Sequence, residues 1–212
     1  MNLWMIAALS LSLPLITNTG QVSATPEASR TIVFLGDSLT AGLGLPLDQA
    51  FPSLIETRLQ AERRPWNVVN AGISGDTTAG GLARLDWIYK QKVDVLVVAL
   101  GTNDGLRGIP AEQIEKNLRA ILRRAQKEGS RVLLAGIRLP DNFGPQTQAR
   151  FAAIYPRLAE EFRVPLVPFL LEGVAMEPGL NQADGIHPNA AGARKVADHL
   201  WVKLGPMLFS AR

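Results

Sequence analysis

A serine and a histidine, far apart in the chain, stand in segments of the kind that carry nucleophilic chemistry. Residues 36–40 read Gly-Asp-Ser-Leu-Thr, and residues 184–187 read Asp-Gly-Ile-His. Ser38 acts as a nucleophile when a base takes its proton, and the imidazole of His187 can do so near neutral pH. Asp184 lies close enough in sequence to reach the other imidazole nitrogen and fix its tautomer. The three residue types therefore predict acyl transfer by a Ser-His-Asp triad.

Acyl transfer also needs hydrogen-bond donors for the oxyanion, and two further loops offer them. Residues 70–76 (NAGISGD) form a turn in which the backbone amide of Gly72 can approach a substrate closely. Residues 101–105 (GTNDG) carry the side-chain amide of Asn103. With the backbone amide of Ser38, these groups predict an oxyanion hole in which each donor lowers the barrier by roughly 3–4 kcal/mol.

The elements that must position these loops follow from the hydrophobic pattern. Apolar runs of strand length occupy residues 31–36, 66–70, 93–100, 131–137 and 164–167. Amphipathic stretches with helical spacing occupy residues 48–62, 77–91, 111–128, 146–162 and 189–204. This alternation predicts a parallel sheet with helices on both faces, and ligand sites in such sheets lie beyond the carboxyl ends of the strands. The four polar loops fall at those ends or just before the last helix.

Composition narrows the function class. The chain has 212 residues, 47% of them hydrophobic and 19% charged, which is typical of a single globular domain. It has no cysteine and two histidines, so disulfide scaffolds and thiolate zinc sites are excluded and a multi-histidine metal site is disfavoured. The net charge of +3 is too small to indicate a nucleic-acid partner. The acyl-transfer groups described above need no metal or organic cofactor, and the substrate that we expect for them is a small-molecule or lipid ester. We also expect a monomer that makes at most transient contact with a membrane surface.

The first segment has the pattern of an export signal. Residues 1–24 contain no charged side chain, residues 3–16 are mostly apolar, and small residues precede a cleavage position near Ala24. The apolar run is short for a membrane helix, which takes about twenty residues. We therefore expect a signal peptide over residues 1–24, a mature domain over residues 25–212, and a periplasmic or secreted location. An uncleaved membrane anchor is the alternative.

Together, the four polar loops resemble those of the GDSL, or SGNH, hydrolase superfamily, whose four name residues match Ser38, Gly72, Asn103 and His187 in order. Further segments are similar to the bacterial periplasmic subgroup of thioesterase I, lysophospholipase and arylesterase. These segments are residues 73–77 (ISGDT), 80–85 (GGLARL), 103–108 (NDGLRG), 137–140 (IRLP) and 154–156 (IYP).

The resemblance covers roughly residues 30–205 and implies both a fold and a site. The fold of the family is a three-layer α/β/α sandwich with a five-stranded parallel sheet in flavodoxin-like order. The family's catalytic triad carries over onto Ser38, Asp184 and His187, and its oxyanion donors onto Ser38, Gly72 and Asn103. The activity implied is hydrolysis of carboxylic esters and thioesters, such as aryl esters, lysophospholipids and acyl-CoA, through an acyl-enzyme on Ser38.

Two departures from the family pattern concern the substrate side of the site. Thr102 stands where the family usually has glycine, so we expect the loop that carries Asn103 to differ slightly. Residues 141–145 (DNFGP) fall in a loop that covers the acyl groove in relatives, and Pro145 stiffens it by fixing φ. The apolar side chains near these loops predict an acyl-binding wall, with ordinary packing as the alternative. Its members would be Leu106, Leu139 and Phe143.

Other interpretations of these residues stay open at this point. Asp184 could instead cap a turn or the following helix, and Asn103 could cap a turn. A carbohydrate or cell-wall O-acetylesterase on the same fold is the alternative enzyme. A catalytically idle lipid-binding or envelope protein is the alternative from another class.

Overall fold

Five parallel strands form one sheet in the order β2-β1-β3-β4-β5. The computed structural model describes residues 30–209, so the predicted export signal lies outside the described residues. The strands are β1 (Arg30–Gly36), β2 (Trp66–Gly72), β3 (Val95–Ala99), β4 (Arg131–Ala135) and β5 (Leu166–Val167). The prediction of a five-stranded parallel sheet in flavodoxin-like order is confirmed.

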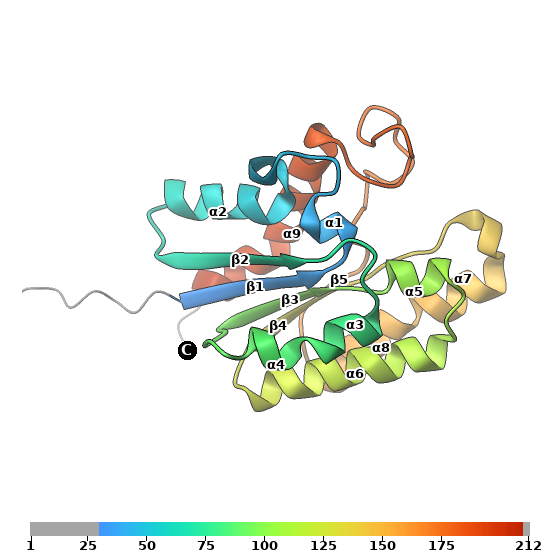
Figure 1. The fold of residues 1–212 in the computed structure, drawn as a ribbon, viewed down its shortest axis with the longest axis horizontal. Coiled ribbons are helices and arrows are strands. Elements are labelled where there is room, and N and C mark those ends of the chain that lie inside the picture. The colour runs from blue at the N-terminus through green and yellow to red at the C-terminus, as the bar shows by residue number, and fades with distance from the viewer. Residues whose placement is uncertain (1–29, 210–212) are drawn as a thin grey trace, which may run out of the picture.

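Helices cover both faces of the sheet and complete a three-layer α/β/α sandwich (Figure 1). On one face lie α2 (Phe51–Ala61) and α9 (Ala190–Phe209), with α1 (Ser38–Ala41) at the carboxyl end of β1. The other face carries α3 (Thr78–Ala83), α4 (Leu85–Ile88), α6 (Ala111–Lys127) and α8 (Ile154–Phe162). The remaining elements are the helices α5 (Thr102–Leu106) and α7 (Pro145–Ala152) and the 3₁₀ turns η1 (Leu47–Gln49) and η2 (Asp141–Phe143).

Burial explains which apolar runs became strands. In β3 every residue is buried, and in β1 all but the first are, because helices cover both faces of these central strands. The edge strand β5 has only two residues, so the predicted strand over 164–167 was too long. Pro165 and Pro168 flank it, and Pro168 has no N–H to continue the ladder.

Two predicted helices are each divided in two. The stretch 77–91 breaks at Arg84 into α3 and α4, and the stretch 146–162 breaks at Ala153 into α7 and α8. Pro156 accounts for the second break, because its ring replaces the N–H that would bond to Ala152 four residues earlier. The last helix runs to Phe209, beyond the predicted end at 204. None of the helices described between residues 30 and 209 is both long and apolar enough to cross a membrane.

The strand register brings the polar loops to one edge of the sheet. Gly36, the last residue of β1, is paired with Gly72 at the end of β2 and with Ala99 at the end of β3. The three following loops therefore start at the same level. The backbones of β2 and α1 also approach each other closely here, since a Cβ on Gly72 would lie 2.2 Å from the backbone nitrogen of Ala41. Only glycine fits at position 72.

This close approach predicts that Gly72→Ala destabilises the protein. The nearest atoms belong to the backbone of α1 and cannot rotate away, so the cost should be about 1–3 kcal/mol of unfolding free energy. The measurement is the urea midpoint at constant slope. Gly179→Ala is the control, because a Cβ there would meet nothing within 4 Å. Equal midpoints for the two variants would contradict the packing argument.

Candidate active site

Three of the predicted side chains form one hydrogen-bonded series. The Oγ of Ser38 lies 2.8 Å from Nε2 of His187, although 149 positions separate the two residues. The Nδ1 of His187 lies 2.6 Å from Oδ2 of Asp184. The fold thus brings the end of β1 against the loop that precedes α9, with the serine, imidazole and carboxylate in the order needed for proton transfer.

The loop that carries His187 is organised around Asp184. Its Oδ1 accepts hydrogen bonds from the backbone amides of Ile186, at 2.9 Å, and of His187, at 3.0 Å. The His187 amide, the imidazole and the Ile186 amide together lower the pKa of Asp184 to about 2. An ionised carboxylate facing Nδ1 favours the tautomer that carries its proton there. The Nε2 lone pair is then directed at the hydroxyl of Ser38.

Ser38 owes its position to a very short helix. It is the first residue of α1, whose N-cap Asp37 accepts a hydrogen bond from the amide of Leu39 at 3.0 Å. The helix ends after one turn at Gly42, which has a φ of 75°. The amide of Ser38 therefore lies at a helix N-terminus, where backbone N–H groups lack intrahelical acceptors.

The two other predicted oxyanion donors lie at the same edge of the sheet but differ in their partners. Asn103 uses one amide hydrogen to donate to the backbone oxygen of Asp76, at 2.9 Å, which leaves its second hydrogen for a ligand. The amide of Gly72 donates to Oδ1 of Asn70 at 3.0 Å. Gly72 can therefore join an oxyanion site only by sharing its hydrogen or by exchanging this acceptor.

Asn70 is a residue that sequence reasoning missed. Besides accepting from Gly72, it donates from Nδ2 to the backbone oxygen of Thr40, at 2.9 Å, and so ties the end of β2 to α1. An asparagine two residues before a glycine is the pattern of an Asx turn, in which the side chain bonds to the backbone two positions on. That pattern is the signal that could have identified it.

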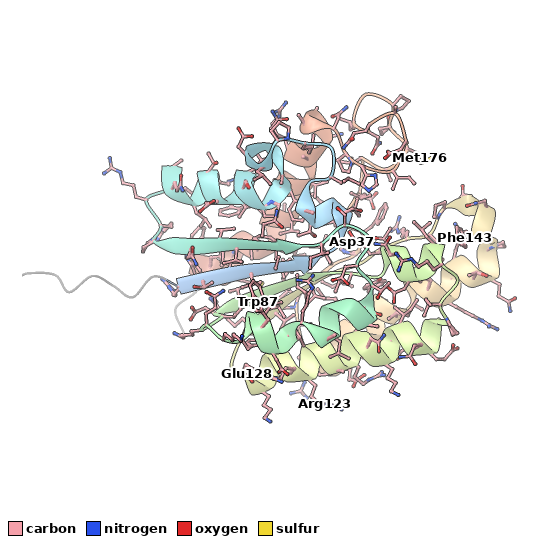
Figure 2. The ribbon with its side chains drawn as sticks, viewed as in Figure 1. Asp37, Trp87, Arg123, Glu128, Phe143 and Met176 are labelled. Atoms are coloured by element: carbon pink, nitrogen blue, oxygen red, sulfur yellow. The ribbon has the colours of Figure 1, made fainter. Side chains whose placement is uncertain are left out.

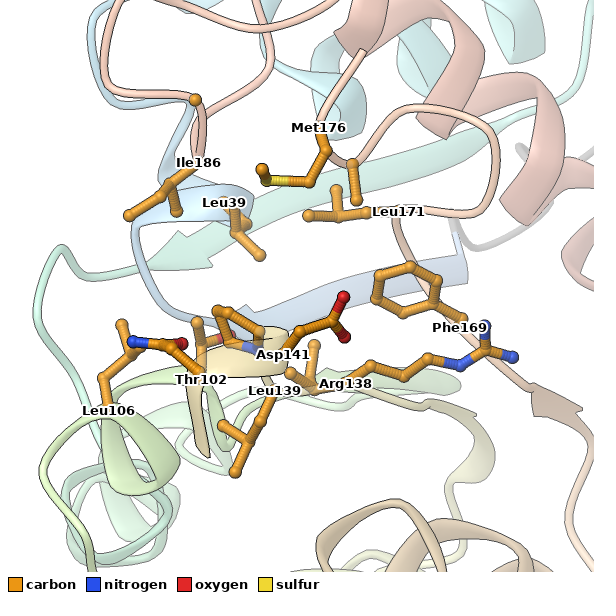
Figure 3. Close-up of a pocket in the computed structure, with 15 residues that line it drawn as sticks. Leu39, Thr102, Leu106, Arg138, Leu139, Asp141, Phe169, Leu171, Met176 and Ile186 are labelled. Carbon is orange, nitrogen blue, oxygen red and sulfur yellow. The ribbon is translucent and has the colours of Figure 1, made fainter. Parts of the chain in front are cut away.

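An apolar cavity of about 530 Å³ lies beside the hydrogen-bonded series (Figure 3). Leu39, which follows Ser38, and Ile186, which precedes His187, both line it. Leu106 and Ile186 lie at one end of the cavity, and the stacked side chains of Phe169 and Arg138 lie at the other. The complete lining is Leu39, Thr102, Leu106, Ile137, Arg138, Leu139, Pro140, Asp141, Asn142, Phe169, Leu171, Ala175, Met176, Gly185 and Ile186.

The three predicted members of the acyl-binding wall do not all share this cavity. Leu106 and Leu139 line it, whereas Phe143 lines a second cavity of about 280 Å³, which Leu139 also borders. In Figure 2, Phe143 and Met176 lie at the same end of the molecule, so the two cavities that share Leu139 are neighbours. Thr102, the departure from the family pattern, begins α5 and faces the apolar cavity.

In the described part of the chain, titratable side chains do not gather into a metal-binding group. Within the described residues, no set of three or more His, Cys, Asp or Glu side chains could hold a metal ion. The second histidine, His199, lies in α9 with its Nε2 at 3.0 Å from the backbone oxygen of Phe169. This contact links α9 to the segment that follows β5.

Comparison with known proteins decides the family. Residues 34–195 match the GDSL-like lipase/acylhydrolase family. The chain belongs to this family.

Individual relatives agree with this membership over most of the chain. Esterase TesA of Pseudomonas aeruginosa is 44% identical over 182 residues, which are 85% of this chain and 90% of that protein. The Escherichia coli protein named thioesterase 1/protease 1/lysophospholipase L1 is also 44% identical over 182 residues, 85% of this chain and 86% of that one. A crystal structure of TesA superposes with a TM-score of 0.81 and covers 84% of this chain and 99% of that chain, at 44% identity. The protein is therefore an ester-hydrolysing enzyme with the fold of the SGNH hydrolases.

A buried carboxyl next to Ser38 predicts that the stability of the protein depends on pH. Burial raises the pKa of Asp37 to about 6, against the Leu39 amide, which lowers it. Figure 2 shows Asp37 inside the molecule, where β1 ends. Because the folded protein then holds this proton more tightly than the unfolded chain, stability falls as the pH rises from about 4 to above 6.

Asp37→Asn should remove this contribution while keeping an Oδ1 that can cap α1. The difference in unfolding free energy between the variant and the wild type should then grow by about 2–3 kcal/mol in favour of the variant from pH 4 to pH 7.5. Urea denaturation at four pH values in this range is the measurement. Asp48→Asn, which removes an exposed carboxylate, should follow the wild type. A pH-independent difference for Asp37→Asn would show that Asp37 does not titrate in this range.

Proposed function

We propose that this enzyme hydrolyses carboxylic esters and thioesters with medium or long acyl chains through an acyl-enzyme on Ser38. The observation that carries the proposal is the series from Ser38 through His187 to Asp184, with contacts of 2.8 Å and 2.6 Å, beside an apolar cavity. Cavities of this size bury most of a ligand of several carbons, and an apolar lining suits an acyl chain.

The reaction divides into two steps. In the first, the Oγ of Ser38 attacks the carbonyl carbon while Nε2 of His187 takes its proton, and the imidazolium then returns that proton to the leaving alcohol or thiol. In the second, His187 takes a proton from water, which attacks the acyl-enzyme and releases the carboxylic acid and free Ser38. Asp184 stays ionised throughout and stabilises the imidazolium in both steps.

The oxyanion of each tetrahedral intermediate needs donors that are already in place. In this proposal the backbone amide of Ser38 and the free amide hydrogen of Asn103 supply two of them. Gly72 supplies the third when Asn70 gives up or shares the Gly72 amide. The chemistry proposed needs only these groups and water.

The substrate class follows from the cavity. It extends from the residues next to Ser38 and His187 to the stack of Phe169 on Arg138, far beyond the space that an acetyl group fills. This favours fatty acyl esters, lysophospholipids and acyl thioesters over the O-acetyl groups of carbohydrates. The names of the relatives, an esterase and a thioesterase/lysophospholipase, agree with this range.

The proposal is tested with p-nitrophenyl esters of two to sixteen carbons, acyl-CoAs and lysophospholipids. We expect kcat/KM to rise from acetyl to a longer acyl chain, and Ser38→Ala to lose at least a thousandfold in kcat. A sharp optimum at acetyl would favour the O-acetylesterase. Full activity of Ser38→Ala, or failure of Ser38 to react with an organophosphonate, would overturn the acyl-enzyme mechanism.

Asp184→Asn tests the role of the carboxylate separately. Asparagine can keep the Oδ1 acceptor for the Ile186 and His187 amides, but it places an N–H₂ donor against Nδ1. His187 then prefers the tautomer with its proton on Nε2, which cannot accept from Ser38. We expect kcat to fall on the order of 10³–10⁴-fold with little change in KM. Asp198→Asn, on the surface of α9, is the control and should keep wild-type kcat.

We also propose that the enzyme is exported. The uncharged segment of residues 1–24 supports cleavage near Ala24. Export would keep the enzyme away from cytoplasmic acyl-CoA, so lysophospholipids or other esters would be nearer its native substrate. N-terminal sequencing of the periplasmic or secreted protein should begin near Thr25. Recovery of uncleaved protein from the membrane fraction would instead support an anchor.

A further inference from the structure

Arg84 connects two of the loops that carry the proposed oxyanion donors. It lies in the break between α3 and α4, and its side chain reaches back to the carboxyl ends of the strands. Its Nε donates to Oδ2 of Asp76 at 2.8 Å, and its Nη2 donates to the backbone oxygen of Gly36 at 3.1 Å. The side chains of Arg84 and Asp76 are only 15% and 10% exposed. This is a largely buried ion pair at the edge of the sheet where Ser38 lies.

Each residue that accepts a hydrogen bond from Arg84 also contacts a proposed oxyanion donor or its neighbour in sequence. Asp76 accepts the hydrogen bond from the Asn103 side chain through its backbone oxygen, at 2.9 Å. Gly36 O also accepts from the amide of Ile73, the residue after Gly72, at 3.1 Å. The same carbonyl belongs to the peptide bond between Gly36 and Asp37, the residue before Ser38. One guanidinium therefore joins the segment before Ser38 to the loop that orients Asn103.

The neighbourhood of Asp76 leaves this carboxylate little freedom. Its Oδ1 accepts from the amide of Thr77 at 2.9 Å, and its own amide donates to the oxygen of Ile73 at 3.0 Å. A Cβ on Gly80 would lie 1.9 Å from Oδ1 of Asp76, so α3 can pass over the carboxylate only because residue 80 has no side chain. The aspartate is held from several sides, and Arg84 supplies the contact that reaches the neighbouring strand.

We infer that Arg84 is a positioning residue for the proposed reaction and that it acts by holding Asp76 so that the Asn103 amide faces the oxyanion. This inference rests on the proposed function, because it assigns Arg84 to the oxyanion site of that mechanism. Arg84 touches no reacting atom. It fixes the distance between the segment before Ser38 and the loop that orients Asn103.

The physical consequence is a loss in kcat rather than in substrate affinity. An oxyanion donor is effective only where charge develops, so a displacement of Asn103 weakens the transition state more than the bound ester. Misplacement by about 1 Å can cost roughly a hundredfold in rate. An arginine with a purely structural role would lower the denaturation midpoint and leave kcat of the folded enzyme unchanged.

Arg84→Lys in the full chain is the first test. Lysine keeps the positive charge, but its single ammonium lacks the planar fork that bridges Asp76 and the Gly36 carbonyl. With p-nitrophenyl esters, well below the denaturation temperature, we expect kcat to fall about ten- to a hundredfold and KM to change less than about threefold. Arg124→Lys is the matched control, because Arg124 also donates to two acceptors through two guanidinium nitrogens, here the surface carboxylates of Glu128 and Asp86. It should keep wild-type kcat.

A double-mutant cycle with Asn103→Ala tests the route of the effect. If Arg84 acts through Asn103, Arg84→Lys should cost much less, within about threefold, once the Asn103 amide is gone. Multiplicative losses would overturn the inference, and so would wild-type kcat in Arg84→Lys. If the lysine variant does not fold, Asp76→Asn replaces it in the same cycle, since it breaks the ion pair and keeps the backbone oxygen that Asn103 contacts.

Ser38→Ala, measured in parallel, separates this inference from the function on which it rests. If Ser38→Ala remains active, the acyl-enzyme mechanism fails. If Ser38→Ala is inactive and Arg84→Lys is unaffected, the mechanism stands and only the role of Arg84 is overturned.

Discussion

The register of β1 between β2 and β3 is the constraint on which the site depends. Because the strands are parallel, Gly36 lies beside both Gly72 and Ala99, and the three loops that follow start at one level. The register itself follows from burial. Apolar side chains of β1 and β3 fill both faces of the sheet, and a shift by one residue would exchange the two faces. Hydrophobic packing thus sets where the polar residues stand.

The strand register sets the approximate positions of the site loops, and small residues and polar side chains then fix those positions more closely. Gly72 lets the end of β2 pass against α1 without a side chain between them. Asn70 then ties the two segments together, and Asp76 accepts hydrogen bonds from the side chains of both Arg84 and Asn103. Close packing and hydrogen bonds therefore act together. The packing removes freedom from the loops, and the hydrogen bonds choose one arrangement among those that remain.

Much of the fold and of the candidate site could be predicted from the sequence, because the hydrophobic runs and motifs that indicate them are local. The strand order came from the family resemblance, and the existence of the five strands came from their apolar runs. Asp184 and His187 belong to one loop, so their contact depends on three residues of spacing. The breaks at Arg84 and Ala153 and the short β5 were not predicted. The break at Ala153 and the short β5 depend on single prolines, Pro156 and Pro168, and a periodic hydrophobic pattern does not register the effect of one residue.

The sequence by itself determined the kind of chemistry that this protein can do. Residue types that can supply a nucleophile, a base, its acidic partner and amide donors stand in ordered motifs, and such motifs can be recognised without coordinates. Only the tertiary structure decided which groups share contacts. The 2.8 Å contact across 149 positions, the acceptor that Gly72 already has, and the separation of Phe143 from the apolar cavity are examples. Distances of this kind depend on how helices and strands pack, and a linear pattern does not specify that packing to a fraction of an ångström.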